Sequence, residues 1–503
     1  MEALKRWRAG WGYPTSLLCV YGFFSTVKPL EPFLIPYLTG PDKNLTMEEV
    51  TNQIFPVWTY SYLALLVPVF LLTDWLLYKP VVVFQCVALF VTTAMLLWLQ
   101  GVAVMQAMQF FYAVVTACEV AYFSYIYSMV ALRHYRKATS YCRTAQLLGY
   151  TVGSVLGQLL VSFDLLSYHY ILVFTLVLTA IALVTSFILP MPQRSMFFHK
   201  GIDDQDEDNA EGEDGKVEKG RPPETGELEG GTFKAPSQHE AKLSSRGSSS
   251  HERSSSEVSA ETGGTDAVPE GCGSALVMLW KDFRQCYSSR ELLYWSVWWA
   301  LATCGYNQTV NYVQALWEHV EPSSNFTIYN GGVEAVSNLF GAATAYGIGF
   351  TTVDWSYWGE LALGGFSGLG GGALYLMVFI GNIWVCYAGY VIFKCLYMLL
   401  ITIAMFQIAA GLSMKRYALV FGANTFCALV IQTILTFIVV DSRGLGLDIV
   451  TQFIIYGTYF SGMALVFFLR GLYTILNVRR RRHVESKSTG EPQCVKMTDI
   501  ETN

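Results

Sequence analysis

The 503-residue sequence is poor in charge: Asp, Glu, Lys and Arg make up 14% of it, whereas hydrophobic residues make up 53%. Soluble domains typically carry about 25% charged residues. A deficit of this size excludes an ordinary soluble domain and indicates that lipid is the solvent around most of the chain. It also makes each charge inside an apolar run informative, because an ion at membrane depth is costly.

The sequence also lacks the common motifs that carry chemistry. None of its 11 cysteines falls in a CxxC pair, which favours packing over metal binding or disulfides. The glycine-rich GGFSGLGGG at 364–372 lacks the Lys-Ser/Thr end of a phosphate-binding loop, so close helix packing explains it better. We expect neither a cleavable secretion signal nor an ATPase domain. The sequence therefore favours a gradient-driven membrane protein over an enzyme, with no cofactor and no nucleic-acid partner.

What the chain does contain is a series of apolar runs long enough to cross a bilayer. A helix of roughly 20 apolar residues spans the hydrocarbon core. About twelve such runs lie near 14–37, 51–73, 80–100, 102–130, 140–163, 168–190, 291–315, 331–351, 358–379, 382–410, 417–440 and 450–470. The sequence predicts an all-α membrane protein with twelve transmembrane helices.

The loops predict the orientation of these spans, because Lys and Arg concentrate on the cytoplasmic side. Basic residues precede the first span, separate alternate pairs of spans and end with Arg479–Arg482 after the twelfth. They share one side if both termini are cytoplasmic. The opposite loops carry the glycosylation sequons of Asn44 and Asn325. We therefore expect glycosylation at these two asparagines on the outer face.

A polar stretch divides the spans into two sets of six. Residues 201–272 are rich in Asp, Glu, Ser, Gly and Pro, and Phe233 is their only aromatic, so they cannot form a core. We expect a cytoplasmic tail (1–13), a six-helix half (14–190), a cytoplasmic linker (191–290, disordered at about 201–272), a second six-helix half (291–470) and a cytoplasmic tail (471–503). This is the outline of the major facilitator fold, in which the substrate binds between the halves.

Two spans carry a charge near their middle. The fourth span, 102–130, has Glu119 with Tyr122 at i+3, and the tenth has Lys394 with Tyr397 in the same relation. Ions at membrane depth mark pathways or pair with partners, so all four residues are site candidates. Lys394 either pairs with Glu119 or contacts an anionic group.

Charges also occur in the first and eighth spans. Lys28 and Glu31 lie at i and i+3, where they either neutralise each other or take part in binding. Pro29 and Pro32 flank Glu31, and we expect them to loosen the helix and free backbone carbonyls. Glu334 begins the eighth span, where both a structural or gating role and ligand contact remain open.

Aromatic residues near these charges suit a cationic ring. A positively charged heterocycle is held by stacking and by cation–π attraction, roughly 0.5–2 kcal/mol per ring. The candidates are Phe55, Trp58, Tyr112 and Tyr150, although ordinary packing accounts for any one of them taken alone.

Long strings of the sequence resemble one known family, that of the reduced folate carrier and the thiamine transporters. Among them are IFPVWTYSYL at 54–63, YSSRELLYWSVWWAL at 287–301, RYALVFGANTF at 416–426 and DSRGLGL at 441–447. The resemblance covers essentially every span but not the linker or the tails. It implies a facilitator-fold carrier that takes up a vitamin across the plasma membrane by alternating access.

Within that family, charge separates the substrate classes. The folate carrier has Arg where this chain has Glu119, and Lys where it has Gln432. Folates are dianions, whereas thiamine carries a permanent positive charge, so the resemblance implies thiamine as substrate. Lys394 and the residues after it are most similar to the thiamine-transporter-2 branch.

The resemblance also implies individual contacts. Trp58 and Tyr112 would hold the thiamine rings, with polar contacts from Glu31, Tyr150 and Asn307. Gln109 departs from the pattern, because thiamine transporters usually have Glu there. An amide still forms hydrogen bonds but adds no negative charge, which predicts weaker thiamine binding or a shifted substrate range.

The sequence leaves the coupling and two rival functions open. Coupling to protons or to an exchanged ion is consistent with Glu31 and Glu119, which would titrate if buried. One rival is a carrier of folate or another organic ion of the same family. The other is a membrane scaffold or signalling protein that docks partners on its acidic linker.

Overall fold

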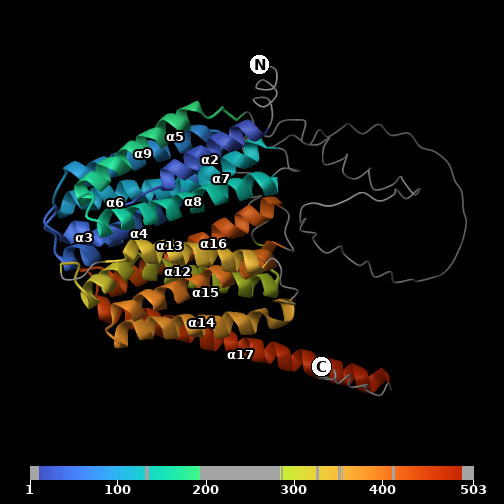
Figure 1. Ribbon diagram of the computed structural model, residues 1–503. Helices are drawn as coiled ribbons and strands as arrows, with labels where there is room; N and C mark the ends of the chain where they lie inside the picture. The colour runs from blue at the N-terminus through green and yellow to red at the C-terminus, as the bar shows by residue number, and fades with distance from the viewer. Residues whose placement is uncertain are drawn as a thin grey trace, which may run out of the picture. The chain divides into compact units, whose positions relative to one another are not determined.

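The computed structural model describes residues 11–130, 135–192, 287–324, 328–348, 355–409 and 414–489, with Arg284 and Val353 in addition. Within these ranges all regular elements are helices (Figure 1). The first set comprises α2 (Gly12–Thr26), η1 (Glu31–Phe33), α3 (Leu34–Thr39), η2 (Glu49–Ile54), α4 (Phe55–Trp75), α5 (Lys79–Trp98), α6 (Val102–Ala117), α7 (Glu119–Met129), α8 (Tyr135–Ser162) and α9 (Tyr168–Ile188). The second set comprises α12 (Arg290–Val320), α13 (Asn330–Ile348), α14 (Trp355–Phe379), α15 (Ile383–Ala409), α16 (Met414–Leu435), η4 (Thr436–Val440) and α17 (Ile449–Thr489).

Nine helical segments in the described part of the chain are long and apolar enough to cross a membrane. They confirm the predicted all-α membrane class. The predicted spans 14–37, 291–315 and 331–351 overlap α2, α12 and α13, which are not among the nine. α2 stops after 15 residues, and α12 carries four side-chain amides between Asn307 and Gln314. The count of twelve spans therefore stays a prediction.

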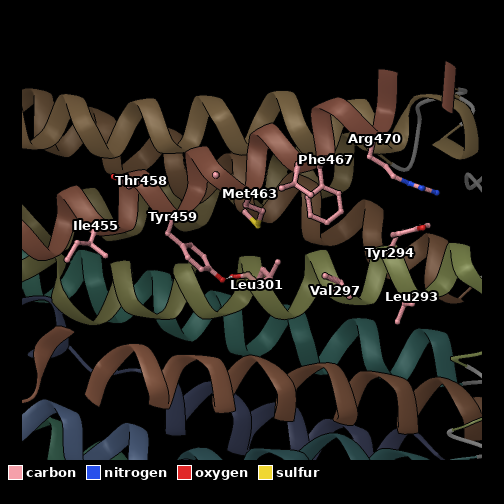
Figure 2. Close-up of a pocket in the computed structure, with 12 residues that line it drawn as sticks. Leu293, Tyr294, Val297, Leu301, Ile455, Thr458, Tyr459, Met463, Phe467 and Arg470 are labelled. Carbon is pink, nitrogen blue, oxygen red and sulfur yellow. Dashed lines mark hydrogen bonds between the residues drawn. The ribbon is translucent and has the colours of Figure 1, made fainter. Parts of the chain in front are cut away.

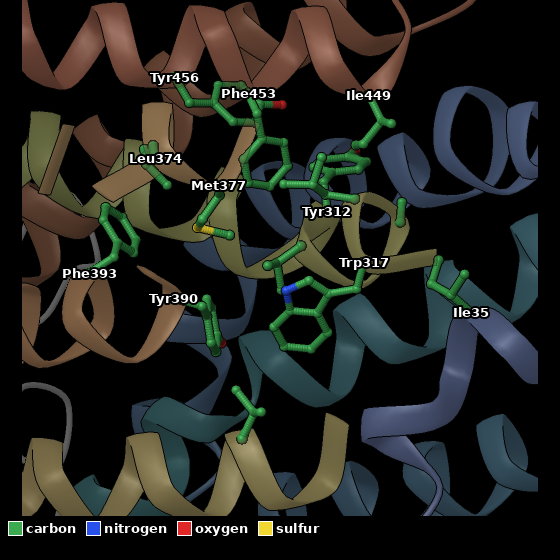
Figure 3. Packing of buried hydrophobic residues seen from close by; sticks show 14 of the residues in the cluster. Ile35, Tyr312, Trp317, Leu374, Met377, Tyr390, Phe393, Ile449, Phe453 and Tyr456 are labelled. Atoms are coloured by element: carbon green, nitrogen blue, oxygen red, sulfur yellow. The ribbon is translucent and has the colours of Figure 1, made fainter. Parts of the chain in front are cut away.

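The buried apolar side chains form two clusters. The smaller cluster lies within the first set and includes Leu18, Tyr21 and Val82. The larger cluster fills the second set, where Figure 3 shows the rings of Tyr390, Phe393 and Tyr456, and extends to Phe33, Ile35, Leu38 and Ile54 of the first set. The two sets thus share buried apolar surface at the end of the bundle that carries α3 and η2.

The first predicted span is interrupted between α2 and η1, where Pro29 and Pro32 occur. Proline removes a backbone donor and clashes with the preceding turn, so a helix cannot continue regularly through this pair. The carbonyl of Glu31 accepts a hydrogen bond from Gln314 Nε2 (3.0 Å) in addition to that from the Leu34 N–H. The carbonyl of Pro32, four residues before Pro36, which has no N–H, accepts one from Asn330 Nδ2 (3.1 Å). The structure shows the predicted interruption of the helix, and the carbonyls of Glu31 and Pro32 accept hydrogen bonds from side chains of the second set.

A glycine stripe on α8 lets the interrupted segment pack closely. Gly149, Gly153 and Gly157 are four residues apart and share one helix face. A Cβ on Gly157 would overlap the carbonyl oxygen of Pro29, and one on Gly153 would lie 2.8 Å from the backbone nitrogen of Lys28. Small residues allow such backbone contact between membrane helices. The glycine face of α8 therefore packs directly against the backbone of the interrupted segment.

We predict that Gly157→Ala destabilises the protein, because the added methyl group must displace the backbone at Pro29. Overpacking of this kind costs about 1–3 kcal/mol. The measurement is thermal unfolding of the purified protein in detergent. Gly365→Ala is the matched control, since a Cβ there meets nothing within 4 Å. An equal unfolding temperature for the two variants would show that the close contact is unimportant.

Candidate functional site

Glu119 stands at a break in the fourth predicted span. α6 ends at Ala117 and α7 begins at Glu119, with Cys118 as the turn between them. A carboxylate in the first turn of a helix is favoured by the unpaired N–H groups and partial positive charge there. The Glu119 side chain is half-buried and forms no ion pair within the described residues. The sequence predicted one continuous helix over 102–130, so this break is a correction.

Several tyrosines lie within electrostatic range of the Glu119 carboxylate. The charge of Glu119 interacts through space with Tyr62 of α4, Tyr112 of α6 and Tyr150 of α8. Tyr21 of α2 is affected in the same way, so four helices contribute aromatic rings to the electrostatic environment of one carboxylate. Tyr112 and Tyr150 were predicted as site residues, and Tyr62 was missed although it lies one turn after Trp58.

Trp58 connects α4 to the same group of side chains. Its indole N–H donates to Thr116 Oγ1 at 3.2 Å, and the Thr116 hydroxyl donates in turn to the Tyr112 carbonyl at 3.0 Å. The ring of Trp58 lies 5.6 Å from that of Tyr62, tilted by 36°. The indole is thereby held beside α6, within one helical turn of Tyr112.

Lys28 and Glu31 form an ion pair, with 3.9 Å between Nζ and Oε1. Tyr112 joins them: Lys28 Nζ donates to the tyrosine oxygen at 3.1 Å, and the tyrosine hydroxyl donates to Glu31 Oε1 at 3.0 Å. The Glu31 side chain remains 41% exposed, whereas that of Lys28 is 15% exposed. Mutual neutralisation is the alternative that the structure favours for these two charges. Counting Glu119 as well, one cation and two carboxylates leave a formal charge of −1.

The second set of helices contributes amide and hydroxyl groups. Asn307 Nδ2 of α12 donates to Gln432 Oε1 of α16 at 3.1 Å, which brings two predicted residues together. Tyr397 of α15 shares a hydrogen bond with Thr303 at 3.0 Å. Its ring stacks on that of Tyr306, with centroids 3.9 Å apart and planes within 11°. Tyr306 was missed, although it directly precedes the predicted Asn307.

Lys394 is paired within its own half of the protein. Its Nζ donates to Glu334 Oε2 at 2.6 Å, and the hydroxyl of Tyr390 donates to Glu334 Oε1 at 2.7 Å. The indole of Trp317 packs edge-on against Tyr390, with ring centroids 5.2 Å apart. Lys394 is 5% exposed. In this structure the partner of Lys394 is Glu334, and the expected pairing with Glu119 in other states or with an anionic group stays a prediction.

Three other predicted residues lie in packed surroundings. Tyr122 is 1% exposed, and its hydroxyl lies 3.3 Å from the carbonyl oxygens of Leu18 and Cys142, so it joins α7 to α2 and α8. Phe55 packs against Tyr312 of α12 at 6.0 Å between ring centroids. Gln109 is 6% exposed, one turn before Tyr112. The i+3 spacing of Tyr122 therefore did not bring its hydroxyl to the Glu119 carboxylate.

The two predicted glycosylation positions differ in what can be said of them. Asn44 is exposed between α3 and η2 and adopts φ 53°. The neighbouring Thr46 and Glu49 exchange hydrogen bonds as a capping box at the start of the next helix. Asn325 lies outside the described residues.

Two glutamines join the two sets of helices near α3. Gln158 of α8 donates to the Ile328 carbonyl at 2.8 Å and accepts from the Gly332 N–H at 3.0 Å. Gln314 of α12 accepts from the Ile35 N–H at 3.4 Å and makes the bond to the Glu31 carbonyl given above. We call these two residues the amide latch. The sequence signal was a glutamine within an apolar helix, and we overlooked it.

A further contact between the two sets centres on Asp441, just beyond η4. Tyr60 of α4 donates to Asp441 Oδ2 at 2.7 Å, and Arg443 pairs with the same oxygen at 2.9 Å. Burial raises the pKa of Asp441, but the hydrogen bonds from Arg443 and Tyr60 outweigh it and leave the pKa below its ordinary value. Asp441 therefore stays ionised at neutral pH and holds α4 against the end of α16.

Comparison with known proteins assigns the family. The sequence model described as "Reduced folate carrier" matches residues 9–455. The chain belongs to the reduced folate carrier family. It is 52% identical to human Thiamine transporter 1 over 94% of this chain and 92% of that protein. It is 48% identical to human Thiamine transporter 2 over 98% and 97%, and 37% identical to the human Reduced folate transporter over 94% and 74%.

Solved structures support the fold. A POT family transporter superposes with a TM-score of 0.58 over 92% of this chain and 96% of its own, at 11% identity. A variant of the nucleoside transporter NupG gives 0.57 over 90% and 98%, at 12% identity. The family member described here thus has the predicted major facilitator fold, and it is a membrane transporter rather than an enzyme.

We predict that Gln314→Ala shifts the protein toward a state open at the α3 end, because two hydrogen bonds to the first set are lost. At about 0.5–1.5 kcal/mol per bond, the equilibrium shifts by roughly 5–150-fold. The measurement is labelling of Phe55→Cys in intact cells by a membrane-impermeant thiol reagent. Gln106→Ala is the control, since Gln106 bonds the Gln53 carbonyl within the first set. Unchanged labelling would exclude a latch role for Gln314.

Proposed function

We propose that this protein takes up thiamine across the plasma membrane by alternating access, driven by a proton gradient or by exchange. The human relatives that share about half of its residues are both named thiamine transporters. The observation that carries the proposal is the half-buried carboxylate of Glu119, which forms no ion pair with the described residues and acts electrostatically on nearby tyrosines. Thiamine is a monocation with two aromatic rings, and both its charge and its shape find complementary groups there.

The balance of charge in both sets of helices disfavours folate. Lys28 is matched by Glu31, and Lys394 is matched by Glu334 at 2.6 Å. Glu119 then remains as the net charge of the group, and Asn307 with Gln432 is neutral. Within the group of Lys28, Glu31 and Glu119, a dianion would meet a net negative charge, whereas a monocation is attracted. This argument supports a cationic substrate independently of the relatives' names.

We assign the substrate contacts in the same terms. Glu119 provides the charge, Trp58 and Tyr112 provide ring faces, and Tyr150 and Asn307 provide polar groups. Glu31 acts through Tyr112, whose hydroxyl it accepts. Lys394 and Tyr122 are held by Glu334 and by backbone carbonyls, so we now give them structural roles.

The topology completes the proposal. We infer twelve spans in two six-helix halves, joined by the linker 191–290, with both termini in the cytoplasm. The α3 end then faces outward, which puts the exposed Asn44 sequon where glycosylation occurs. The amide latch closes this outer end, and its opening would admit substrate from outside.

We predict that Glu119→Gln lowers thiamine uptake at least tenfold, because the substrate loses its counter-charge at low dielectric while the side chain keeps its size. The measurement is uptake of labelled thiamine and labelled folate in parallel, in cells expressing equal surface amounts. Glu48→Gln, at an exposed helical position directly before η2, is the control.

The paired assay separates the rivals. Folate uptake by the wild type without thiamine uptake would contradict the proposal and favour an anion carrier. Normal thiamine uptake by Glu119→Gln would refute the electrostatic role alone. Loss of all uptake on deleting 203–265 would favour the scaffold, since a solvated linker is dispensable to a carrier.

We predict that Gln109→Glu increases thiamine affinity severalfold, because it adds a second negative charge one turn from Tyr112. The change appears as a lower KM with surface expression unchanged. Gln106→Glu adds the same charge one turn earlier and serves as the control. A rise in KM for Gln109→Glu would mean that this buried position cannot accommodate a carboxylate.

A further inference from the structure

An apolar groove runs along the outside of the second set of helices, between α12 and α17. It has a volume of about 720 Å³ and is lined by side chains that include Leu293, Val297, Leu301, Ile455, Met463 and Phe467. Figure 2 shows Ile455 at one end and Arg470 with Tyr294 at the other. The groove lies apart from Glu119 and from the latch, and no role proposed above uses it.

The walls of the groove suit hydrocarbon rather than a polar vitamin. The Tyr459 hydroxyl donates a hydrogen bond to the Leu301 carbonyl (2.8 Å), and the hydroxyls of Thr458 and Tyr375 share a hydrogen bond (2.8 Å). The polar atoms of these two lining residues are therefore satisfied by the protein. At Gly462, which lines the groove, an added Cβ would meet nothing within 4 Å. The groove is thus open at its middle and apolar along its length.

The Arg470 end of the groove carries a cation with spare donors. The Arg470 guanidinium lies 3.7 Å from the centre of the Tyr294 ring, and its Nε donates to Glu360 Oε1 at 3.4 Å. The Glu360 carboxylate also accepts a hydrogen bond from the Thr474 hydroxyl, so it is shared between Arg470 and Thr474. No other hydrogen bond of Arg470 is made to the described residues, and the side chain is 34% exposed. An arginine has five N–H donors in a fork that matches a phosphate group.

Further positive charge lies on the same side. Arg290 is exposed and precedes Tyr294 by one helical turn, on the same face of α12. The sequence of α17 continues to Arg479–Arg482. Under the proposed orientation this end meets the cytoplasmic leaflet, whose lipids are anionic and which attracts basic side chains beside membrane helices.

The geometry points to a binding site for an anionic phospholipid of the cytoplasmic leaflet, with its phosphate on Arg470 and one acyl chain in the groove. From Ile455 to Arg470 the helix rises about 22 Å, whereas one leaflet contributes about 15 Å of hydrocarbon. The groove is therefore longer than one leaflet is thick, so an acyl chain that enters beside Arg470 can lie in the groove over the full length of the acyl chain. The inference rests on the proposed orientation but not on the identity of the transported substrate.

The test is native mass spectrometry and thermal unfolding of the full-length purified protein with phosphatidylserine or phosphatidylcholine of identical chains. We expect phosphatidylserine to bind about tenfold more tightly, as a charge-assisted contact would give. Glycerophosphoserine, which has the headgroup without chains, should not raise the unfolding temperature. Equal binding of the two lipids would overturn the proposal, as would stabilisation by a sterol without stabilisation by phosphatidylserine.

Variants locate the site. Arg470→Gln should abolish the preference for phosphatidylserine, and Arg290→Gln, which does not disturb Glu360, should reduce it. Gly462→Trp should block the chain and remove tight binding of phosphatidylserine. Gly365→Trp on α14 adds the same side chain outside the groove, where the Cβ is also uncrowded, and should bind lipid like the wild type. Undiminished phosphatidylserine binding by a folded Gly462→Trp protein would refute the groove.

Discussion

The hydrogen bonds of Tyr112 to Lys28 and Glu31 hold opposite charges together where the first membrane segment is broken. The prolines make the break, and the glycines of α8 allow the broken segment to pack against a helix. Within the broken segment, the carbonyls of Glu31 and Pro32 accept hydrogen bonds from the second set of helices. Without Tyr112, the charges of Lys28 and Glu31, 3.9 Å apart, would be stabilised only by their attraction to each other. The position of α6 relative to the break, and with it that of Glu119, depends on this contact.

The same requirement operates differently in the second set. Glu334 receives both Lys394 and Tyr390, so the pair is embedded in aromatic surroundings and leaves no net charge. Breaking a buried pair by removing one partner is costly, on the order of 3–5 kcal/mol, because the other charge stays behind. One half thus keeps an unbalanced carboxylate and the other balances its charges. We propose that this asymmetry sets the preference of the protein for the sign of its substrate.

The sequence allowed the class of fold and most of the charged side chains of the site to be predicted, because hydropathy and the rarity of membrane charges are local signals. The partners of these side chains lie on other helices, and the local sequence pattern does not reveal them. Lys394 pairs with Glu334 from a helix that the repeat argument did not consider, and the i+3 rule could not reveal that Tyr122 bonds carbonyls of α2 and α8. The helix break at Cys118 involves neither proline nor glycine, so the sequence contains no helix-breaking residue that would predict it. The four-residue spacing of Gly149, Gly153 and Gly157 is a sequence pattern typical of close helix packing, and it could have predicted the face of α8 that contacts the first segment.

The amide latch has a consequence for speed. Its bonds run between neutral amides and backbone groups, each worth about 0.5–1.5 kcal/mol net, because water can replace either partner when the halves separate. Such contacts are insensitive to salt and to pH near neutrality, unlike an ion pair. A carrier must open and close its outer end in every cycle, and a strongly bonded closure would trap it in one state. We propose that the weak, uncharged bonds of the latch, beside the charge-assisted bond of Tyr60 to Asp441, keep the open and closed states within thermal reach of each other, so the cycle can run in either direction as concentrations dictate.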